Sequence, residues 1–353
     1  MSRIVFLDTV SPLPYDTRSF AERAVQGTEA SVMRIADSLS ACVMQHNRAS
    51  AWERYLPVQP LATAEHVVVI REARALAQAR DLFPNAQLHL WLHDKLRPGS
   101  KRGRRLRRSA GILRAAKVSI ICVSDTHRQD VLQTLRWAGI DGLAVCTRYN
   151  PLDPTLQPDG SPFDDRQLVF FSSPNKGLAF ALDAFGALRR ALPELRLVVG
   201  NPGYKTDPLA ALSGVQFLGP QPQAAMHAQV RRSLCTFQPN FRIPETFGLV
   251  YAESNALGTP VLTHDFGAAA EVVADPRQLL PVRAAYRGYE AVVGGLKPRW
   301  RRVPARLAAA AGLFDAYIER IRQWRGGARP VVRADPRFAL RALAAQWREL
   351  LDP

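Results

Sequence analysis

Short apolar runs alternate with helix-like stretches along most of this chain, and this alternation restricts the fold more than any other feature. Short buried strands separated by helices predict βαβ units, and therefore a parallel sheet. In the first half, the expected strands are residues 4–7, 67–70, 88–92, 118–123 and 143–147. The clearest helical patterns between them are residues 28–40, 72–79 and 127–137.

A proline-rich segment interrupts the alternation in the middle of the chain. Residues 148–166 contain four prolines and a glycine, and proline at this density stops both helices and sheet ladders. The alternation then restarts with strands 168–171, 195–199, 215–218, 234–237 and 260–263 and helices 178–191, 224–232, 249–257 and 268–274. We therefore predict a domain over 1–150, a linker over 151–166, a second domain over 167–330, and a C-terminal helix in 331–353 that returns to the first domain.

The chain has 353 residues, which is enough for two domains with a core each. We predict an α/β fold of two Rossmann-like domains that face each other across a cleft. Ligands of such sheets bind at the carboxyl ends of the strands, so the cleft is the expected site.

The formal net charge of +16 is unusual, and one segment supplies most of it. Lys95 to Lys117 contains ten Lys or Arg and no acid, and without these ten charges the balance is +6. Three interpretations stay open: contact with an anionic membrane leaflet, contact with an acidic or phosphorylated acceptor, or a solvated mobile loop. Nucleic acid is not expected, because this segment has no aromatic residue for base stacking.

The cysteines and the N-terminus indicate a cytoplasmic protein. The four cysteines form no C-x-x-C pair, and we interpret most of them as small core residues, which suits a reducing compartment. The first residues resemble an opening strand and not a signal peptide. No apolar run approaches the ~20 residues that a membrane-spanning helix requires. We expect a cytoplasmic protein, with peripheral association on the inner leaflet if the basic segment contacts lipid.

The segment 244–261 carries the most specific chemistry. Glu245 is predicted to lie in a loop, a helix is expected to begin near Gly248, and Glu253 falls in the middle of that helix. A helix N-terminus after a glycine offers N–H groups and a positive dipole end, which suits a diphosphate. Two carboxylates nearby suit sugar and ribose hydroxyls. The alternative is two solvated glutamates on a surface helix, which the apolar neighbours of Glu253 disfavour.

The motif Glu245-x7-Glu253 resembles that of glycosyltransferase family 4, a retaining family with the GT-B fold. Residues 264–273 are similar to the strand–Gly–Gly–x–x–Glu element of that family, with Ala268 replacing the second glycine. Residues 170–178 resemble its strand and Lys-Gly turn, and 149–153 resemble its linker turn. The resemblance covers about 149–275 and is weaker over 1–148.

The resemblance implies roles for individual residues. Glu253 would bind the ribose hydroxyls, and Glu245 would position the donor sugar. Backbone N–H groups of Phe247, Gly248 and Leu249 would face the sugar and the diphosphate. Lys176 would neutralise the leaving diphosphate, and Ser173 lies where the family usually has an arginine.

In the first half, His93 matches the position of a family histidine near the anomeric carbon, and Gly27 matches a glycine at the first helix. A buried structural histidine is the alternative for His93. His89 and His93 are four residues apart, but a strand is expected there and a third metal ligand is not evident, so no metal site is predicted.

These features predict a retaining, metal-independent, hexosyltransferase-like glycosyltransferase. It would use a nucleotide-diphosphate sugar and a glycan or lipid-linked acceptor, as in bacterial surface polysaccharide or lipopolysaccharide assembly, without a cofactor. The sequence contains no Asp-x-Asp motif to hold a divalent cation on the diphosphate. Two alternatives stay open: a GT-B sugar-nucleotide epimerase or hydrolase, and a non-catalytic polyanion-binding protein.

Overall fold

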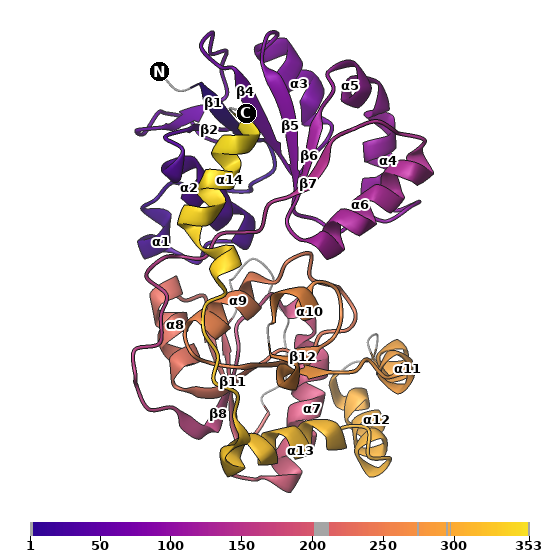
Figure 1. Ribbon diagram of the computed structural model, residues 1–353. Helices are drawn as coiled ribbons and strands as arrows, with labels where there is room; N and C mark the ends of the chain where they lie inside the picture. Colours follow the sequence, from indigo (N-terminus) through magenta and orange to yellow (C-terminus); the bar gives the residue numbers. More distant parts are fainter. Residues whose placement is uncertain (1–2, 201–211, 274, 294–295, 297, 352–353) are drawn as a thin grey trace. The chain divides into compact units, whose positions relative to one another are not determined.

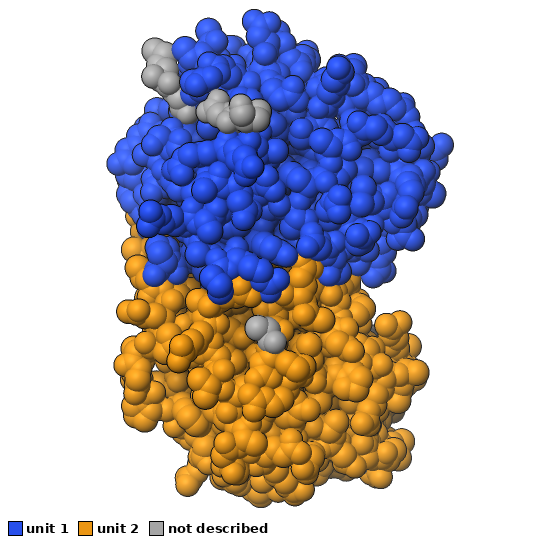
Figure 2. All heavy atoms as spheres, viewed as in Figure 1, with its two compact units in different colours: residues 1–19, 26–154, 336–353 blue, residues 20–25, 155–335 orange. Residues whose placement is uncertain are grey.

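The computed structural model describes residues 3–200, 212–273, 275–293, 296 and 298–351, and the chain forms two compact units (Figures 1 and 2). Unit 1 comprises residues 1–19, 26–154 and 336–353. Unit 2 comprises residues 20–25 and 155–335.

Unit 1 is built on a parallel seven-stranded sheet in the order β3-β2-β1-β4-β5-β6-β7. Its strands are β1 (Ile4–Asp8), β2 (Cys42–Gln45), β3 (Tyr55–Pro57), β4 (His66–Ile70), β5 (Gln87–Leu92), β6 (Ser119–Cys122) and β7 (Val145–Thr147). Its helices are α2 (Gly27–Ser38), α3 (Ala75–Leu82), α4 (Lys101–Arg108), α5 (Ala110–Ala115), α6 (Asp125–Ala138) and α14 (Leu340–Leu351), and α1 (Ser19–Glu22) spans the division between the units.

Unit 2 is built on a parallel six-stranded sheet in the order β10-β9-β8-β11-β12-β13. Its strands are β8 (Asp164–Phe170), β9 (Arg196–Gly200), β10 (Val215–Gly219), β11 (Ser233–Phe237), β12 (Val261–His264) and β13 (Leu279–Leu280). Its longer helices are α7 (Leu178–Ala191), α8 (Gln223–Arg231), α9 (Leu249–Ala256), α11 (Ala284–Val293), α12 (Pro298–Ala310) and α13 (Asp315–Gln323), and α10 (Ala269–Val272) is a single turn.

Local sequence explains several of these elements. β4 is a run of valines and isoleucine that is buried from Val67 to Ile70, as expected for a strand covered on both faces. α6 begins after Ser124, whose hydroxyl accepts a hydrogen bond from the N–H of His127 at 2.9 Å, and it ends at Gly139 in the left-handed conformation. α7 has the bounds that its apolar spacing predicts.

The strand orders of the two units are the same when each unit is numbered from its own first strand. Both follow the doubly wound 3-2-1-4-5-6 pattern, and unit 1 adds a seventh strand. The chain reverses direction across the sheet between β1 and β4 in unit 1 and between β8 and β11 in unit 2. Ligands of doubly wound sheets bind beyond the carboxyl ends of the strands at this point.

Aromatic clusters fill both cores. In unit 1, Trp347 of α14 packs edge-on against Trp91 of β5, with ring centroids 4.7 Å apart, so the C-terminal helix covers this sheet. In unit 2, Phe180 lies at the centre of an aromatic cluster with Phe241, Tyr286 and Phe314, with centroids 4.7, 5.5 and 5.6 Å away.

The units differ from the expected ranges at their edges. The first unit extends to Pro154, β8 begins at Asp164 inside the expected linker 151–166, and residues 331–335 belong to unit 2. β8 begins early because Asp164 pairs with the neighbouring strand, with its N–H bound to the carbonyl of Arg232 at 2.8 Å. Residue 274, the last of the expected helix 268–274, lies outside the described residues. Among the described residues, no helix has both the length and the apolar character needed to cross a membrane.

Candidate functional site

Lys176 and Glu245 form an ion pair beyond the carboxyl ends of β8 and β11. These strands are neighbours at the reversal point of the unit 2 sheet, so two residues 69 positions apart in the chain meet there. The Glu245 side chain is 7% exposed, whereas that of Lys176 is 31% exposed. The pair therefore places a nearly buried carboxylate behind an ammonium group that solvent or a ligand can reach.

Glycines allow the backbone to close around this pair. Gly177 follows Lys176 with φ +100°, and a Cβ there would lie 2.9 Å from the carbonyl of Pro239. Gly267, after β12, has φ +67°, and a Cβ would lie 2.7 Å from the carbonyl of Glu245. That carbonyl accepts a hydrogen bond from the N–H of Ala268 at 3.0 Å. Loops after three neighbouring strands thus hold one carboxylate in place.

The N-terminus of α9 opens next to this loop. Gly248 is the N-cap residue, with φ +93°, and no side chain caps the helix. No acidic residue lies in its first turn. Phe247 is buried, and Leu249 is the first helical residue. The helix therefore begins where the sequence predicts it. Because uncapped N–H groups at a helix N-terminus attract an anion, the geometry of this N-terminus suits a phosphate.

Glu253 lies in the middle of α9 and is 7% exposed, so it is not a solvated surface glutamate. Its Oε1 accepts a hydrogen bond from Nε2 of Gln223 at 3.1 Å. Gln223 is the first residue of α8, which follows β10. Sequence analysis did not identify Gln223. A polar residue that follows a strand and opens a helix is the signal that would have found it.

Ser173 and Gln238 line the turn that positions Lys176. The Ser173 carbonyl accepts the N–H of Lys176 at 2.8 Å, and its hydroxyl contacts Asn175. Gln238, directly after β11, is fully buried and donates from Nε2 to the carbonyl of Lys176 at 3.0 Å. Gln238 was also missed from the sequence, although it is a polar residue at the end of a buried strand.

The phenol of Tyr251, on α9, has a pKa that is shifted by the groups around it. Burial, and then the negative charge of Glu245, raise the pKa of its phenol well above the usual range. Tyr251 therefore stays neutral at physiological pH. Its ring also packs close to Gly248, where an added Cβ would lie 2.5 Å from the ring.

His93 and Gly27 belong to unit 1. His93 follows β5 and is 8% exposed, with its ring centroid 4.5 Å from that of Trp91. Burial, with a smaller effect from the positive charge of Arg71, lowers the pKa of His93 to about 3. His93 is therefore a neutral imidazole at pH 7. This burial fits the structural interpretation as well as it fits a ligand contact.

Asp94 and Arg71 form a paired network next to His93. Arg71, with φ +64°, donates from Nε and Nη2 to Asp94 at 2.9 and 3.2 Å. Burial opposes the charged form of Arg71, but its hydrogen bond to Asp94 and the charges of Asp94, Asp8 and Glu29 raise its pKa overall. The carboxyl ends of β1, β4 and β5 therefore share one electrostatic neighbourhood.

Gly27 is the first residue of α2, and a capping box closes this helix N-terminus. The Gln26 side chain accepts from the N3 backbone, and the Gln26 N–H donates to Oε2 of Glu29 at 3.3 Å. Glu29 is buried, and its other oxygen accepts from the Ser11 hydroxyl at 2.8 Å. The N-terminus of α2 is thus already occupied by a carboxylate of this chain.

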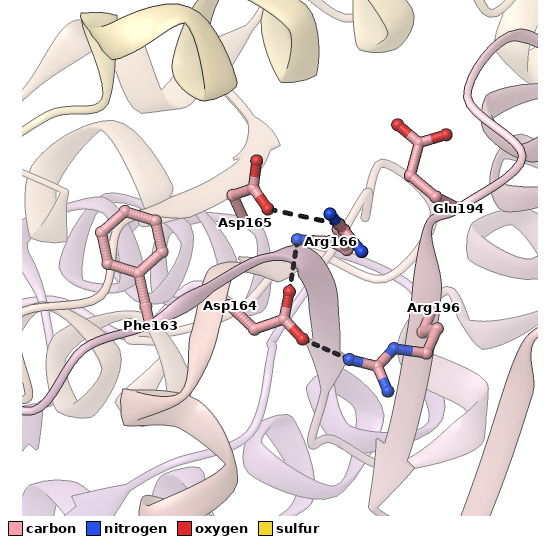
Figure 3. A pocket seen from close by; sticks show the side chains of 6 residues that line it. All are labelled: Phe163, Asp164, Asp165, Arg166, Glu194 and Arg196. Carbon is pink, nitrogen blue, oxygen red and sulfur yellow. Dashed lines mark hydrogen bonds and ion pairs between the residues drawn. The ribbon is translucent and has the colours of Figure 1, made fainter.

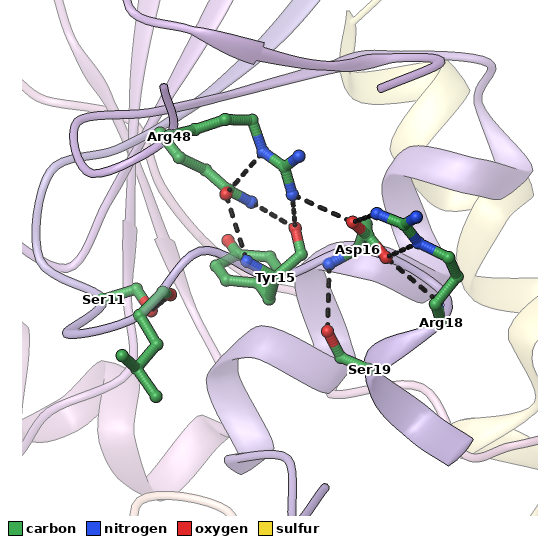
Figure 4. Close-up of polar contacts among 8 residues, drawn as sticks. Ser11, Tyr15, Asp16, Arg18, Ser19 and Arg48 are labelled. Atoms are coloured by element: carbon green, nitrogen blue, oxygen red, sulfur yellow. Dashed lines mark hydrogen bonds and ion pairs between the residues drawn. The ribbon is translucent and has the colours of Figure 1, made fainter. Parts of the chain in front are cut away.

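The loops after β1 and β2 also bind each other (Figure 4). Arg48 donates to the Tyr15 carbonyl at 2.9 Å and to Oδ2 of Asp16 at 3.1 Å. Asp16 also accepts two hydrogen bonds from the Arg18 guanidinium. The hydrogen bond from Arg18 is the main reason that the pKa of Asp16 falls to about 2.

The basic segment is mostly helical, so the third of the three open interpretations of 95–117, a solvated mobile loop, does not describe it. α4 and α5 occupy most of it, and Ser100 caps α4 by accepting from the N–H of Gly103 at 3.0 Å. Six of the ten cations have a partner in unit 1: Lys95 with Asp130, Arg102 with Asp94, Arg104 with the Gly99 carbonyl, Arg105 with Glu72, Arg107 with the Trp137 ring and Arg114 with the Gly139 carbonyl. Within the described part of the chain, the exposed side chains of Arg97, Lys101, Arg108 and Lys117 have no ion pair.

A cavity of about 690 Å³ lies at the amino ends of β8 and β9, the opposite edge of the sheet from Lys176 (Figure 3). Charged residues line it in matched pairs, such as Arg196 with Asp164. Arg325 also binds Asp165 at 3.3 Å. Because its charges are already paired, we assign no ligand to this cavity.

Comparison with known proteins relates most of unit 2 to glycosyl transferases. Residues 160–280 match the family model described as glycosyl transferases group 1. The phosphatidyl-myo-inositol mannosyltransferase of Mycolicibacterium smegmatis is 29% identical over 201 residues, which cover 53% of this chain and 51% of that protein. The corresponding Mycobacterium leprae protein is 28% identical over 177 residues, 47% of this chain and 46% of that protein. The chain therefore spans about half the length of the curated relatives it matches.

Solved structures resemble the chain over its whole length. Anabaena HepE, solved with UDP and glucose, has a TM-score of 0.62 at 18% identity, covering 99% of both chains. WaaG, described as a glycosyltransferase involved in lipopolysaccharide biosynthesis, has a TM-score of 0.58 at 13% identity, also covering 99% of both chains. The fold expected from the sequence is confirmed: two Rossmann-like domains of the GT-B type.

Proposed function

We propose that this chain is a retaining glycosyltransferase that transfers a hexose from a nucleotide-diphosphate sugar to a glycan or lipid-linked acceptor. The main support is the Lys176–Glu245 pair at the β8/β11 reversal point, beside the uncapped N-terminus of α9. This cation, carboxylate and helix N-terminus lie in the segment that matches group 1 glycosyl transferases.

The donor is proposed to bind in unit 2. Glu253, supported by Gln223, accepts hydrogen bonds from the ribose hydroxyls. The diphosphate lies against the backbone N–H groups of Gly248 and Leu249, where the α9 dipole favours negative charge. Glu245 accepts from hydroxyls of the transferred sugar. Ser173 lies in the same turn as Lys176 and contributes a second polar contact to the phosphates.

The transfer exchanges one bond at the anomeric carbon. The bond from the anomeric carbon to the β-phosphate oxygen breaks, and the acceptor oxygen forms its bond on the same face of the sugar. The acceptor proton moves to the departing phosphate, so charges and atoms balance. Lys176 stabilises the negative charge that develops on the diphosphate, a role that needs no divalent metal. In unit 1, the proposed substrate contacts are the neutral imidazole of His93 and the backbone at Gly27.

The four unpaired cations of the basic segment are proposed to bind phosphate or another anion on the acceptor side. Arg97, Lys101, Arg108 and Lys117 are exposed, so an anionic lipid leaflet and an acidic acceptor share the chemistry that they recognise. A role in bacterial surface polysaccharide or lipopolysaccharide assembly, by a cytoplasmic enzyme peripheral to the inner leaflet, agrees with the described role of WaaG.

Calorimetric titration of UDP, GDP and ADP into the full chain, in EDTA, tests the donor site. We expect one nucleotide to bind and Glu253→Ala to weaken it by about 10- to 100-fold, because hydrogen bonds to a charged group contribute roughly 1.5–3 kcal/mol. Glu319→Ala, an exposed glutamate on α13 of the same unit, should bind as the wild type does. If none of the nucleotides binds, the likeness is one of fold alone and polyanion binding becomes the better explanation.

A second measurement separates a transferase from an epimerase or a hydrolase. With a panel of nucleotide sugars, release of the nucleotide should depend on an added acceptor extract. Release at the same rate without any acceptor would contradict a transferase. Conversion of the sugar without release of nucleotide would indicate an epimerase.

A further inference from the structure

Helix α12 of unit 2 exposes its large apolar residues to solvent. Trp300, Val303 and Leu307 are 58, 58 and 67% exposed. Their spacing of three and four residues places them on one face of the helix, called here the α12 face. Val292 and Leu296, in the segment that leads from α11 into α12, are 63 and 38% exposed. Scattered exposed apolar residues are normal, but a row of three on one helix is not.

The inward polar contact of α12 is a charged one, and Ala308 packs against the apolar core of unit 2. The Arg301 guanidinium donates to Oδ2 of Asp183 at 2.8 Å and to the Ala179 carbonyl at 3.1 Å, both on α7. The Tyr289 hydroxyl of α11 donates to the same Asp183 oxygen at 3.0 Å. These bonds hold α11 and α12, which lie side by side in Figure 1, against α7. α12 therefore packs on its unit through Arg301 and the small residue Ala308, and its larger apolar side chains are left exposed.

Positive charge borders the α12 face. Arg302 and Arg306 are exposed on the adjoining side of the helix. The sequence contains no Asp or Glu from Ala291 to Phe314. Glu290, the last acid before this stretch, accepts a hydrogen bond from Arg242 at 2.9 Å. The exposed helix therefore combines an apolar row with cations and has no acid of its own.

We propose that the α12 face docks into the headgroup region of an anionic lipid bilayer. An amphipathic helix with Trp and Leu on one side and arginines beside them lies in the membrane interface plane, with the indole at headgroup level. Self-association of this face in a symmetric dimer would bring Arg302 and Arg306 of two copies together, which like charge disfavours. The proposal does not depend on the donor site, and it concerns a surface on a different unit from α4.

Vesicle sedimentation of the full chain tests this docking. Vesicles of equal parts phosphatidylcholine and phosphatidylglycerol should bind the protein, and vesicles of phosphatidylcholine alone should bind it more weakly. Leu307→Ser should weaken binding by about tenfold, the factor that corresponds to exposing one large apolar side chain. Val331→Ser is the matched control, because Val331 is 82% exposed and lies in the same unit but outside α11 and α12. It should bind as the wild type does.

Fluorescence quenching by brominated lipid then locates the contact. Trp300 is the most exposed of the six tryptophans, and Trp91, Trp324 and Trp347 are buried. The conservative change Trp300→Phe should retain sedimentation with vesicles and lose most of the quenching. Equal quenching in the wild type and Trp300→Phe would overturn the proposal, because binding would then occur elsewhere, for example through α4.

Two further outcomes would also overturn it. Equal vesicle binding by the wild type and Leu307→Ser excludes insertion of this face. A change of oligomeric state in Leu307→Ser, measured by light scattering and without a change in vesicle binding, would indicate that a second copy covers α12.

Discussion

The helices that follow the first strand of each unit differ at their N-termini, although the strand orders of the two sheets match. In unit 1, α2 begins with the capping box of Gln26 and Glu29, so a carboxylate of the chain already occupies its positive end. In unit 2, α7 begins after Gly177, which has a positive φ, without a side-chain cap and without an acid in the first turn. The helix after the first strand is therefore closed by a carboxylate of the chain in unit 1 and left uncapped in unit 2.

This difference shows how a doubly wound sheet is specialised by a few residues. In the proposed donor site, a glycine with positive φ and a lysine leave a helix N-terminus free for a phosphate, whereas a glutamate at the third position of α2 caps that helix. Unit 1 also pairs its other polar groups at strand ends, as Arg71 does with Asp94. We therefore expect changes at the two edges to have unequal consequences.

The largest effect is expected from Glu245→Gln in unit 2. Loss of the carboxylate removes the partner of Lys176 and the proposed contact to the donor sugar, so turnover should fall by about 10²–10³-fold, as for other groups that act on the transition state. Acceptor-dependent nucleotide release measures this. Glu29→Gln in unit 1 should change turnover by only a few-fold, and a comparable loss there would show that the α2 N-terminus also acts on the donor.

Acid should affect unit 1 more than unit 2. Burial lowers the pKa of His93 to about 3, and those of His89 and His127 to about 4, in unit 1, and it lowers the pKa of His264 in unit 2 to about 4. These histidines bind protons more readily when unfolded, where the pKa is about 6.5. Their contribution to stability is therefore complete above about pH 6.5 and is lost as the pH falls towards 4.

Hydrogen exchange measured between pH 7 and 4.5 checks this order. Peptides from β5 and α6 should lose protection at a higher pH than peptides from β11 and α9. Simultaneous loss in both units would mean that they unfold as one cooperative body, and earlier loss in unit 2 would contradict the histidine argument.

The two glycines at helix starts should respond in opposite ways to alanine. Gly248→Ala introduces a Cβ at φ +93° and 2.5 Å from the Tyr251 ring, so we expect a loss of about 1–3 kcal/mol in the free energy of unfolding. Gly27 has no positive φ and is the first residue of a helix, so Gly27→Ala should be neutral or stabilising by up to about 1 kcal/mol. Denaturant unfolding of the pair measures the difference. Equal losses of unfolding free energy in the two variants would contradict the expected difference between Gly248 and Gly27.

The smallest effect is expected from opening the capped helix. Glu29→Ala removes one half of the capping box and a partner of Ser11, and it should cost about 1 kcal/mol in unfolding free energy. Nucleotide affinity should stay the same. Uncapping α2 frees its N–H groups, but α2 has neither a lysine nor a left-handed glycine beside it, as the proposed donor site in unit 2 has. A gain in phosphate binding at unit 1 would show that the capping box alone accounts for the expected difference in anion binding between the two units.

Local patterns predicted those elements in which the chain's own periodicity is strong. α7 matches residues 178–191, and β4, β5 and β11 begin within one residue of their expected positions. β3 was missed because a strand of three residues ending in Pro57 has no alternation to detect. α4 was missed because a helix of arginines has only Gly103 and Leu106 on its buried face.

By itself the sequence determined the two α/β halves, the break between them, and the glutamates on either side of a helix N-terminus. These follow from spacing within a few turns of chain, where backbone preferences act. The order of the strands, the pairing of Lys176 with Glu245 across 69 residues, and the support of Glu253 by Gln223 were decided only by the tertiary structure. Such contacts depend on which strand ends become neighbours in the sheet, and no local pattern specifies that. The exposure of Trp300 and Leu307 has the same origin, because α12 packs on α7 through the bond of Arg301 to Asp183, two residues 118 positions apart in the chain.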